Sequence, residues 1–317
     1  MDIKSLEKIA NNLVAEGKGI LAADESNGTM SNRLEAVGIK ASEISRREYR
    51  VNLFSSPGYE NSISGIILYD ETITQLMDNG ETIPEAMMQR GVYPGIKVDT
   101  GAKELANHKG EKITEGLDNL RERCINYYKL GARFAKWRAV IRISDNIPSE
   151  ACIKVNAHAL ARYAAICQEQ GLVPIIEPEV LMDGDHSAED CFNKTSKVIK
   201  KCFEELMLHN IDFSGIILKP NMILAGASSD KKISNEETAK LTLKCLKENV
   251  PAEVPGIAFL SGGQTEVEAT ENLNLINKYN DTNFIMTYSY GRALQQSALK
   301  FWSKDIKNIE GTQNVFN

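Results

Sequence analysis

Short apolar runs rich in β-branched residues alternate with longer helical runs along almost the whole chain. The short runs, which have the length and composition of strands, lie at residues 18–24, 63–70, 93–99, 134–140, 172–179, 213–221, 256–262 and 284–290. Helix-like segments between them lie at residues 116–130, 156–170, 188–208, 236–249 and 266–278. Because the strands are apolar nearly throughout, the pattern predicts a parallel sheet whose outer face is covered by helices.

The repetition predicts the closed form of such a sheet. About eight strands separated by helices are typical of a (β/α)₈ TIM barrel, an α/β fold, and no linker-like segment divides residues 1–317, so we expect a single domain. An open doubly wound sheet is the alternative. The glycines of GKGILAADES (17–26) precede the first strand, however, whereas a dinucleotide fingerprint follows it. An additional N-terminal helix, with apolar residues from Ile3 to Val14 at helical spacing, is expected to cap the barrel bottom.

Composition and charge restrict the partners that the chain can have. It has 317 residues, of which 42% are hydrophobic and 25% charged, which excludes a disordered chain. The net charge of −6 argues against a nucleic-acid partner, because phosphate contacts need a basic surface. No apolar run approaches the roughly 18–20 residues of a membrane span. We therefore expect no nucleic acid and no membrane among the partners.

Cysteines and histidines give no sign of a disulfide or metal site in the sequence. The six cysteines form no C-x-x-C pair, and we interpret them as reduced thiols of a cytoplasmic protein. The histidines, His108, His158, His186 and His209, are far apart along the chain. We expect them not to cluster and not to form a metal centre.

Ionisable residues occupy the C-terminal ends of most predicted strands, where barrel enzymes place their chemistry. Asp24, Asp70, Lys97 and Asp99 are four of them. Residues two apart share a strand face, which gives the sets Phe134, Lys136 and Arg138; Ile175, Glu177 and Glu179; and Ile217, Lys219 and Asn221. In a barrel one strand face looks inward, where an unpaired charge is unfavourable.

Two of these residues, Lys136 and Lys219, occupy equivalent alternating positions on their strands. If both face inward, they could meet in one interior layer. A lysine with its ordinary pKa of about 10.4 is almost fully protonated at neutral pH. A second cation nearby and desolvation lower that pKa and free the amine as a nucleophile. Each strand-end charge taken alone can equally be a salt-bridged residue at the rim. Together, two inward lysines and several carboxylates suggest Schiff-base chemistry on a carbonyl substrate.

Two glycine-containing elements follow the last two predicted strands. Ser261, Gly262 and Gly263 follow the seventh, and the segment Ser289-Tyr290-Gly291-Arg292 ends the eighth. Loops at these positions of a barrel often bind phosphate through backbone N–H groups, to which an arginine adds a charged donor. An ordinary turn at a helix start is the alternative, and the arginine favours a phosphate site.

Seven motifs cover nearly the whole chain in the order of a known family. They are GKGILAADES (17–26), GIKVDTG (95–101), FAKWR (134–138), IIEPEVLMDGDH (175–186), ILKPNM (217–222), FLSGGQTE (259–266) and YSYGRALQ (288–295). On these motifs the chain resembles class I fructose-1,6-bisphosphate aldolase. The resemblance implies a (β/α)₈ homotetramer of glycolysis and gluconeogenesis that needs no metal or cofactor. It would cleave the sugar phosphate fructose 1,6-bisphosphate reversibly to dihydroxyacetone phosphate and glyceraldehyde 3-phosphate.

The resemblance also implies roles for individual residues. Lys219 matches the Schiff-base lysine, and Glu177 matches the acid/base that dehydrates the carbinolamine. Asp24 matches the carboxylate near the C4 hydroxyl, and Lys136 matches the second active-site lysine. With the supporting carboxylate and the arginine next to the second lysine, the implied catalytic set is Lys219, Glu177, Lys136, Asp24, Glu179 and Arg138.

Two phosphate-binding groups follow from the same motifs. The positions that match the C1-phosphate site are Ser261, Gly262, Gly263, Ser289, Gly291 and Arg292, and those around the other phosphate are Ser26, Thr29, Arg33 and Lys97. Thr29 replaces a serine and Thr100 a lysine that are common in animal members, so the second group is the weaker match. The resemblance further implies a C-terminal tail ending in tyrosine that assists proton transfer at C3, whereas this sequence ends at Asn317.

Two other functions are compatible with these residues. The same Schiff base could act on another ketose phosphate, such as fructose 1-phosphate or sedoheptulose bisphosphate. A binding or scaffold protein could also retain the fold. The second is the weaker alternative, because a scaffold has no use for inward charges such as Asp24, Lys136, Glu177 and Lys219.

Overall fold

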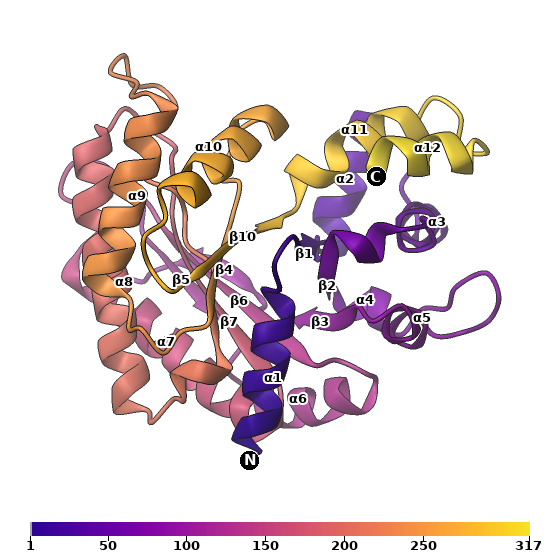
Figure 1. Ribbon diagram of the computed structural model, residues 1–317, viewed down its shortest axis with the longest axis horizontal. Helices are drawn as coiled ribbons and strands as arrows, with labels where there is room; N and C mark the ends of the chain where they lie inside the picture. The colour runs from indigo at the N-terminus through magenta and orange to yellow at the C-terminus, as the bar shows by residue number, and fades with distance from the viewer. Residues whose placement is uncertain (1) are drawn as a thin grey trace.

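Eight parallel strands close into a barrel (Figure 1). The computed structural model describes residues 2–317. The barrel strands are β1 (Gly19–Ala22), β2 (Ile63–Leu68), β3 (Tyr93–Lys97), β6 (Phe134–Ile141), β7 (Val173–Val180), β8 (Ile217–Leu218), β9 (Gly256–Phe259) and β10 (Ile285–Tyr290). Each strand pairs with the next, and β10 pairs with β1 to close the ring. The TIM-barrel prediction is confirmed.

Helices surround this barrel in the order expected of repeated strand–helix units. They are α2 (Asn27–Ala36), α3 (Glu43–Phe54), α4 (Asp70–Ile73), α5 (Ile83–Gln89), α6 (Leu120–Lys129), α7 (Glu150–Glu169), α8 (Ala188–Leu208), α9 (Asn235–Asn249), α10 (Glu266–Tyr279), α11 (Arg292–Trp302) and α12 (Ile309–Phe316). Ser149, Ser187, Ser234 and Thr265 cap α7 to α10, and each accepts a bond from a backbone N–H of the first turn. Within residues 2–317, no helix is both long and apolar enough to cross a membrane.

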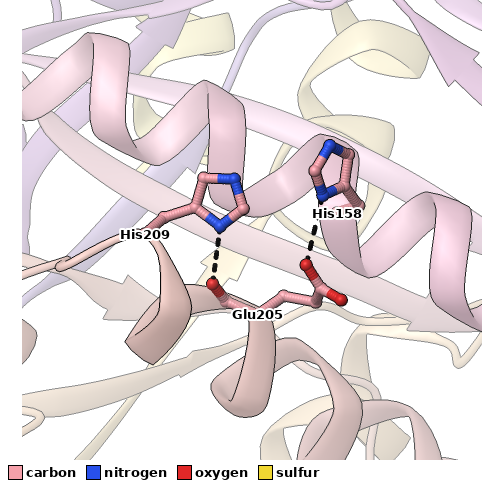
Figure 2. Close-up of side chains that lie close together, drawn as sticks. All are labelled: His158, Glu205 and His209. Carbon is pink, nitrogen blue, oxygen red and sulfur yellow. Dashed lines mark hydrogen bonds and ion pairs between the residues drawn. The ribbon is translucent and has the colours of Figure 1, made fainter.

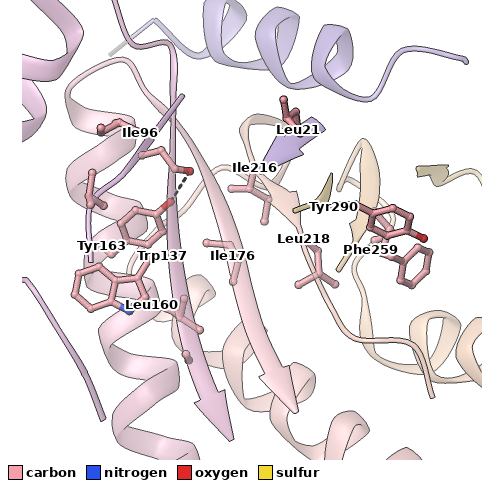
Figure 3. Close-up of a cluster of buried hydrophobic side chains, with 14 of the residues drawn as sticks. Leu21, Ile96, Trp137, Leu160, Tyr163, Ile176, Ile216, Leu218, Phe259 and Tyr290 are labelled. Carbon is pink, nitrogen blue, oxygen red and sulfur yellow. Dashed lines mark hydrogen bonds between the residues drawn. The ribbon is translucent and has the colours of Figure 1, made fainter. Parts of the chain in front are cut away.

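The outward side chains of the strands form the core between barrel and helices (Figure 3). Trp137 of β6 is fully buried and stacks on Tyr163 of α7, with ring centroids 5.6 Å apart. The Tyr163 hydroxyl donates a 2.8 Å hydrogen bond to the carbonyl of Ala135. These contacts join α7 to the strand that carries Lys136, so packing outside the barrel fixes the position of a side chain inside it.

The N-terminal helix, α1 (Ile3–Leu13), closes the lower end of the barrel. Its buried side chains join those at the start of the strands in one apolar cluster, which consists of Leu6, Ile9, Ala10, Leu13, Val14, Ile20, Ala22, Ile67, Phe134, Val173, Ile175, Ile217 and Ala258. The contact is close. A Cβ atom at Gly256 would lie 2.8 Å from the Cβ of Val14, so only glycine fits there. The expectation of a helix that caps the barrel bottom agrees with this packing.

Two local features differ from the sequence prediction. An antiparallel hairpin, β4 (Gly101–Glu104) and β5 (Lys112–Glu115), follows β3 and was not predicted, because its residues are mainly polar. The segment expected as a strand at residues 213–221 contains only the two residues of β8, preceded by a 3₁₀ turn, η2 (Phe213–Gly215). Asp212 accepts from the Ser214 N–H at 2.9 Å and caps that turn, and Pro220 has no N–H to continue the ladder.

Candidate active site

The C-terminal ends of the strands surround a cavity of about 870 Å³. The predicted site residues that line it are Asp24, Ser26, Thr29, Arg33, Lys97, Lys136, Arg138, Glu177, Glu179, Lys219, Ser261, Gly262, Ser289, Gly291 and Arg292. Gly263 is the exception. It lies beside Met182, where an added Cβ would approach the sulfur to 2.9 Å. Residues from nearly every strand end therefore share one space.

Four buried charges meet at the centre of this cavity. The Glu177 carboxylate lies between two lysines: its Oε1 is 3.1 Å from the Lys219 Nζ, and its Oε2 is 3.3 Å from the Lys136 Nζ. The Lys136 Nζ also lies 2.7 Å from the Asp24 Oδ2. None of the four residues is more than 9% exposed. Two cations and two anions thus balance each other in a water-poor interior.

The backbone of the barrel explains why these side chains meet. Lys136 is the third residue of β6, and Glu177 is the fifth residue of the neighbouring β7. Their strands pair along their full length, with Lys136 opposite Ile175 and Arg138 opposite Glu177. Beyond β8, the Lys219 N–H donates to the carbonyl of Ile176 at 2.8 Å. Alternation then turns all three functional side chains into the barrel.

The lysines keep the two carboxylates ionised, and the carboxylates keep Lys136 protonated. Burial would raise the pKa of Asp24, but the charges of Lys136 and Lys219 lower it to about 2. The pKa of Glu177 is also lowered, because Lys136, Lys219 and Arg138 outweigh its desolvation. Burial would lower the pKa of Lys136, but Asp24 and Glu177 raise it above its usual range. The two carboxylates thus keep Lys136 protonated.

A second pair of charges leads from the centre toward the cavity opening. Arg138 forms an ion pair with Glu179 through its Nε. Its side chain is 43% exposed, whereas that of Glu179 is 9% exposed. Burial would lower the pKa of Arg138, but Glu179 and Glu177 raise it. The pair places a fixed positive group on the cavity wall beside the buried charges.

One candidate phosphate site lies where β9 and β10 end. Gly262 has a φ of +50° and Gly263 one of +81°, conformations that suit glycine and turn the loop after β9. Gly291 is the N-cap of α11, and the first N–H groups of a helix have no acceptor within it. The buried Ser289 Oγ has no hydrogen-bond partner among the atoms of residues 2–317. With the Arg292 guanidinium, these groups can bind a dianion.

The residues predicted for the second phosphate also line the cavity, but protein groups already engage them. Ser26 caps α2 by accepting from the Thr29 N–H at 3.3 Å. Arg33 is ion-paired with Glu25, and the Lys97 Nζ lies 2.5 Å from the Asp99 Oδ1. A phosphate at this end would compete with carboxylates for these cations, so this end of the cavity should bind it less strongly than the end near Arg292.

The cavity wall includes residues that the sequence did not mark as part of the site. The Tyr127 hydroxyl donates to the Asp70 carboxylate at 2.7 Å, and Arg123, one turn earlier on α6, donates to the Val98 carbonyl at 2.8 Å. Both come from a helix whose sequence shows only ordinary amphipathic spacing. Glu25 also lines the cavity. Its place next to Asp24 in the AADES motif was the one available indication.

Two expectations about side-chain placement are wrong. Asn221 does not continue the inward face of Lys219; its side chain accepts from the Val180 N–H and donates to Thr195, both at 3.1 Å, because the chain turns at Pro220. The histidines do cluster in part. The rings of His158 and His209 lie 5.1 Å apart, since α7 and α8 pack side by side.

A closed barrel with a cavity of paired lysines and carboxylates at the strand ends defines a TIM-barrel enzyme. The family model described as fructose-bisphosphate aldolase class-I matches residues 5–317 of the chain. The chain belongs to the class-I fructose-bisphosphate aldolase family, and it is an aldolase.

Individual relatives agree with this assignment. A probable fructose-bisphosphate aldolase class 1 of Xylella fastidiosa is 51% identical over 316 residues, which cover 99% of this chain and 95% of the relative. The cytosolic fructose-bisphosphate aldolase 4 of Arabidopsis thaliana is 49% identical and is matched over 99% of this chain and 81% of its own. The solved structure of fructose-bisphosphate aldolase from Plasmodium falciparum, in complex with TRAP and a small-molecule inhibitor, superposes with a TM-score of 0.97. It is 42% identical in sequence, and the match covers 99% of this chain and 91% of the chain in that structure.

Proposed function

We propose that this aldolase cleaves fructose 1,6-bisphosphate reversibly through a Schiff base on Lys219. The observation that carries the proposal is the position of the Glu177 carboxylate, which lies within 3.3 Å of both the Lys219 and the Lys136 amino groups. An amine nucleophile needs a group that can remove its proton and later return one. Glu177 is the residue placed to do both.

Imine formation uses Lys219 and Glu177. Glu177 first takes a proton from the Lys219 ammonium group, and the freed Nζ lone pair attacks the C2 carbonyl of the open-chain sugar. One of the two protons then on the nitrogen moves to the C2 oxygen, which becomes the hydroxyl of the carbinolamine. Glu177 then returns a proton to the C2 hydroxyl of the carbinolamine, which leaves as water, and the nitrogen lone pair forms the iminium bond. Lys136, whose pKa is raised, stays protonated throughout and stabilises the negative charge that develops on the oxygen.

Carbon–carbon cleavage uses Asp24. Its carboxylate, ionised because its pKa is about 2, accepts the proton of the C4 hydroxyl. The C3–C4 bond breaks, glyceraldehyde 3-phosphate is released, and the electron pair moves into the iminium to form an enamine. Protonation at C3 and hydrolysis of the imine release dihydroxyacetone phosphate and regenerate the Lys219 amine. Every proton and electron pair is supplied by substrate, water or side chains, and the proposal includes no metal and no cofactor.

The substrate would lie across the cavity with its two phosphates at opposite ends. The end near Arg292 offers a guanidinium, the N-terminus of α11 and the Ser289 hydroxyl, which has no partner within residues 2–317. These groups suit the C1 phosphate that both substrate and product carry. The end near Arg33 and Lys97 would receive the C6 phosphate. Binding both phosphates fixes C2 beside Lys219, so less entropy is lost when the bound substrate reaches the transition state.

The biological setting follows from the family. We infer a cytoplasmic homotetramer with a glycolytic and gluconeogenic role; the cytosolic designation of the Arabidopsis thaliana relatives supports the location. Sedimentation of the purified enzyme tests the tetramer, and a mass near that of one chain would contradict it.

Steady-state turnover of fructose 1,6-bisphosphate, measured with and without EDTA, tests the proposed activity. We expect equal rates with and without the chelator, and kcat/KM higher for the bisphosphate than for fructose 1-phosphate, which lacks the second phosphate. Loss of turnover with EDTA, restored by zinc, would contradict the mechanism. Equal kcat/KM for the two sugars would contradict the assigned substrate.

A further inference from the structure

Three potential metal ligands meet on the outside of the barrel, between α7 and α8 (Figure 2). They are His158 of α7, Glu205 of α8 and His209, the C-cap residue that follows α8. The His158 Nδ1 lies 3.1 Å from the Glu205 Oε2. One ligand atom from each of the three residues lies within 4.8 Å of the others. None of the three lines the active-site cavity.

Local structure brings these groups together and orients them. Glu205 and His209 are four residues apart, so they lie on the same face of α8, and the packing of α7 against α8 adds His158. The His209 Nδ1 is 2.8 Å from the Glu205 backbone carbonyl. A histidine that donates one ring N–H to a carbonyl keeps its other nitrogen, Nε2, as a ligand, which is the usual arrangement in metal sites.

We propose that His158, Glu205 and His209 bind a divalent transition-metal ion of the zinc type. Two imidazoles and one carboxylate form a ligand set that zinc accepts, with bonds of about 2.0–2.2 Å. Tetrahedral ligands at that radius are about 3.3 Å apart, and the His158–Glu205 pair is already at 3.1 Å. The His158 side chain is half exposed, so its ring can rotate to bring its nitrogen closer to the ligand nitrogen of His209.

Charge and burial favour a cation at this position. The Glu205 side chain is 10% exposed, and among residues 2–317 its one ion-pair partner is His158. The nearby cation Lys201 is engaged by Glu204. A buried carboxylate with two imidazoles beside it gains from a bound divalent ion, and the nitrogen ligands favour zinc over magnesium, which prefers oxygen.

The bound ion would join α7 to α8, the helices that precede and follow β7. Because the site is separate from the cavity, its role is to cross-link two helices, and the aldolase reaction proceeds without it. The test of this metal site is therefore independent of the test of the proposed aldolase function.

Zinc binding to the full-length enzyme tests the proposal. Metal-free protein is titrated with Zn²⁺ against a chromophoric chelator, together with the variants His158→Ala and His209→Ala and the control His108→Ala. His108 is a partly exposed histidine outside the cluster. We expect one tight Zn²⁺ per chain in wild type and control. Each cluster variant should lose more than about 100-fold in affinity, because loss of an outer-shell partner alone already costs about 10–100-fold.

Two further measurements distinguish loss of a specific zinc site from unfolding of the variant and from non-specific zinc binding. Far-UV circular dichroism and aldolase turnover should be the same in all four proteins, and Mg²⁺ should not displace Zn²⁺. X-ray absorption at the zinc edge should show two imidazole nitrogens and a carboxylate oxygen at about 2.0–2.2 Å. Equal zinc affinity in all four proteins, or a loss in only one of the two cluster variants, would overturn the proposal.

Discussion

The two ends of the barrel interior are built from the same strands but have opposite chemistry. The lower end is apolar and is filled by Phe134 and Ile175 together with the side chains of α1. Two residues further along the same strands, Lys136 and Glu177 enter the upper end, where buried charges surround the cavity. One rule of alternation therefore produces a packed layer and a reactive layer in direct contact.

This difference shows how the fold divides stability from chemistry. The lower layer consists of apolar side chains that pack tightly against one another. It also forms the floor of the upper layer, where the interactions of Lys136 and Asp24 gain strength from the absence of water. The apolar end should thus govern the free energy of unfolding, and the charged end should govern the rate of catalysis.

The largest effect is expected for Lys136→Met. Methionine keeps most of the volume but removes the cation that holds Glu177 and Asp24 ionised, so the pKa of both carboxyls should rise. We expect imine formation with dihydroxyacetone phosphate to slow by about 10²–10⁴-fold, measured as the rate of borohydride trapping. Lys97→Met is the matched control, since Lys97 pairs in register with Lys136 but contacts Asp99 instead of Glu177. An unchanged trapping rate in Lys136→Met would make Lys136 a purely structural partner.

The opposite result is expected at the lower end for Phe134→Ala. The Phe134 ring lies over Gly65 and Gly95, where an added Cβ atom at either glycine would come within 2.9 Å of it. Its removal should lower the free energy of unfolding by about 3–5 kcal/mol, measured by urea denaturation. The kcat/KM of the remaining folded enzyme should stay within a few-fold of wild type. A loss of kcat/KM comparable to that of Lys136→Met would show that the two layers are not separable.

A smaller difference should distinguish the two phosphate ends. Arg292→Ala removes a charge-assisted contact worth about 1.5–3 kcal/mol, so binding of both dihydroxyacetone phosphate and fructose 1,6-bisphosphate should weaken about 10- to 100-fold. Lys97→Ala should weaken only the bisphosphate, because the product has no second phosphate. Isothermal titration of both ligands against both variants gives the comparison, and equal effects on the two ligands would reverse the assignment of the ends.

Much of the fold could be predicted because each element carries its own local pattern. Every barrel strand overlaps its expected run, and the long helices α8, α9 and α10 lie within a residue of the segments expected. The prediction was weakest where tertiary contacts decide the structure. The hairpin of β4 and β5 has no apolar alternation, and the pairing of β8 ends at Pro220 although the apolar run continues toward it.

The site could be anticipated where strand parity determines direction. Lys136 and Glu177 lie on strands and Lys219 directly follows β8, so alternation alone predicts that they face one space. The contributions of Arg123 and Tyr127 depend on how α6 packs over the strand ends, which no spacing in the sequence reveals. The approach of His158 to His209 depends in the same way on the packing of α7 against α8.

Covalent trapping tests the central claim most directly. The enzyme is incubated with dihydroxyacetone phosphate in the presence of EDTA, reduced with borohydride and digested, and the modified peptide is identified by mass spectrometry. Because hydride reduces an imine to a stable secondary amine, we predict one label per chain, on Lys219 in the segment ILKPNM. Label on Lys136 or any other lysine, or no label in enzyme that turns over substrate, would contradict the account.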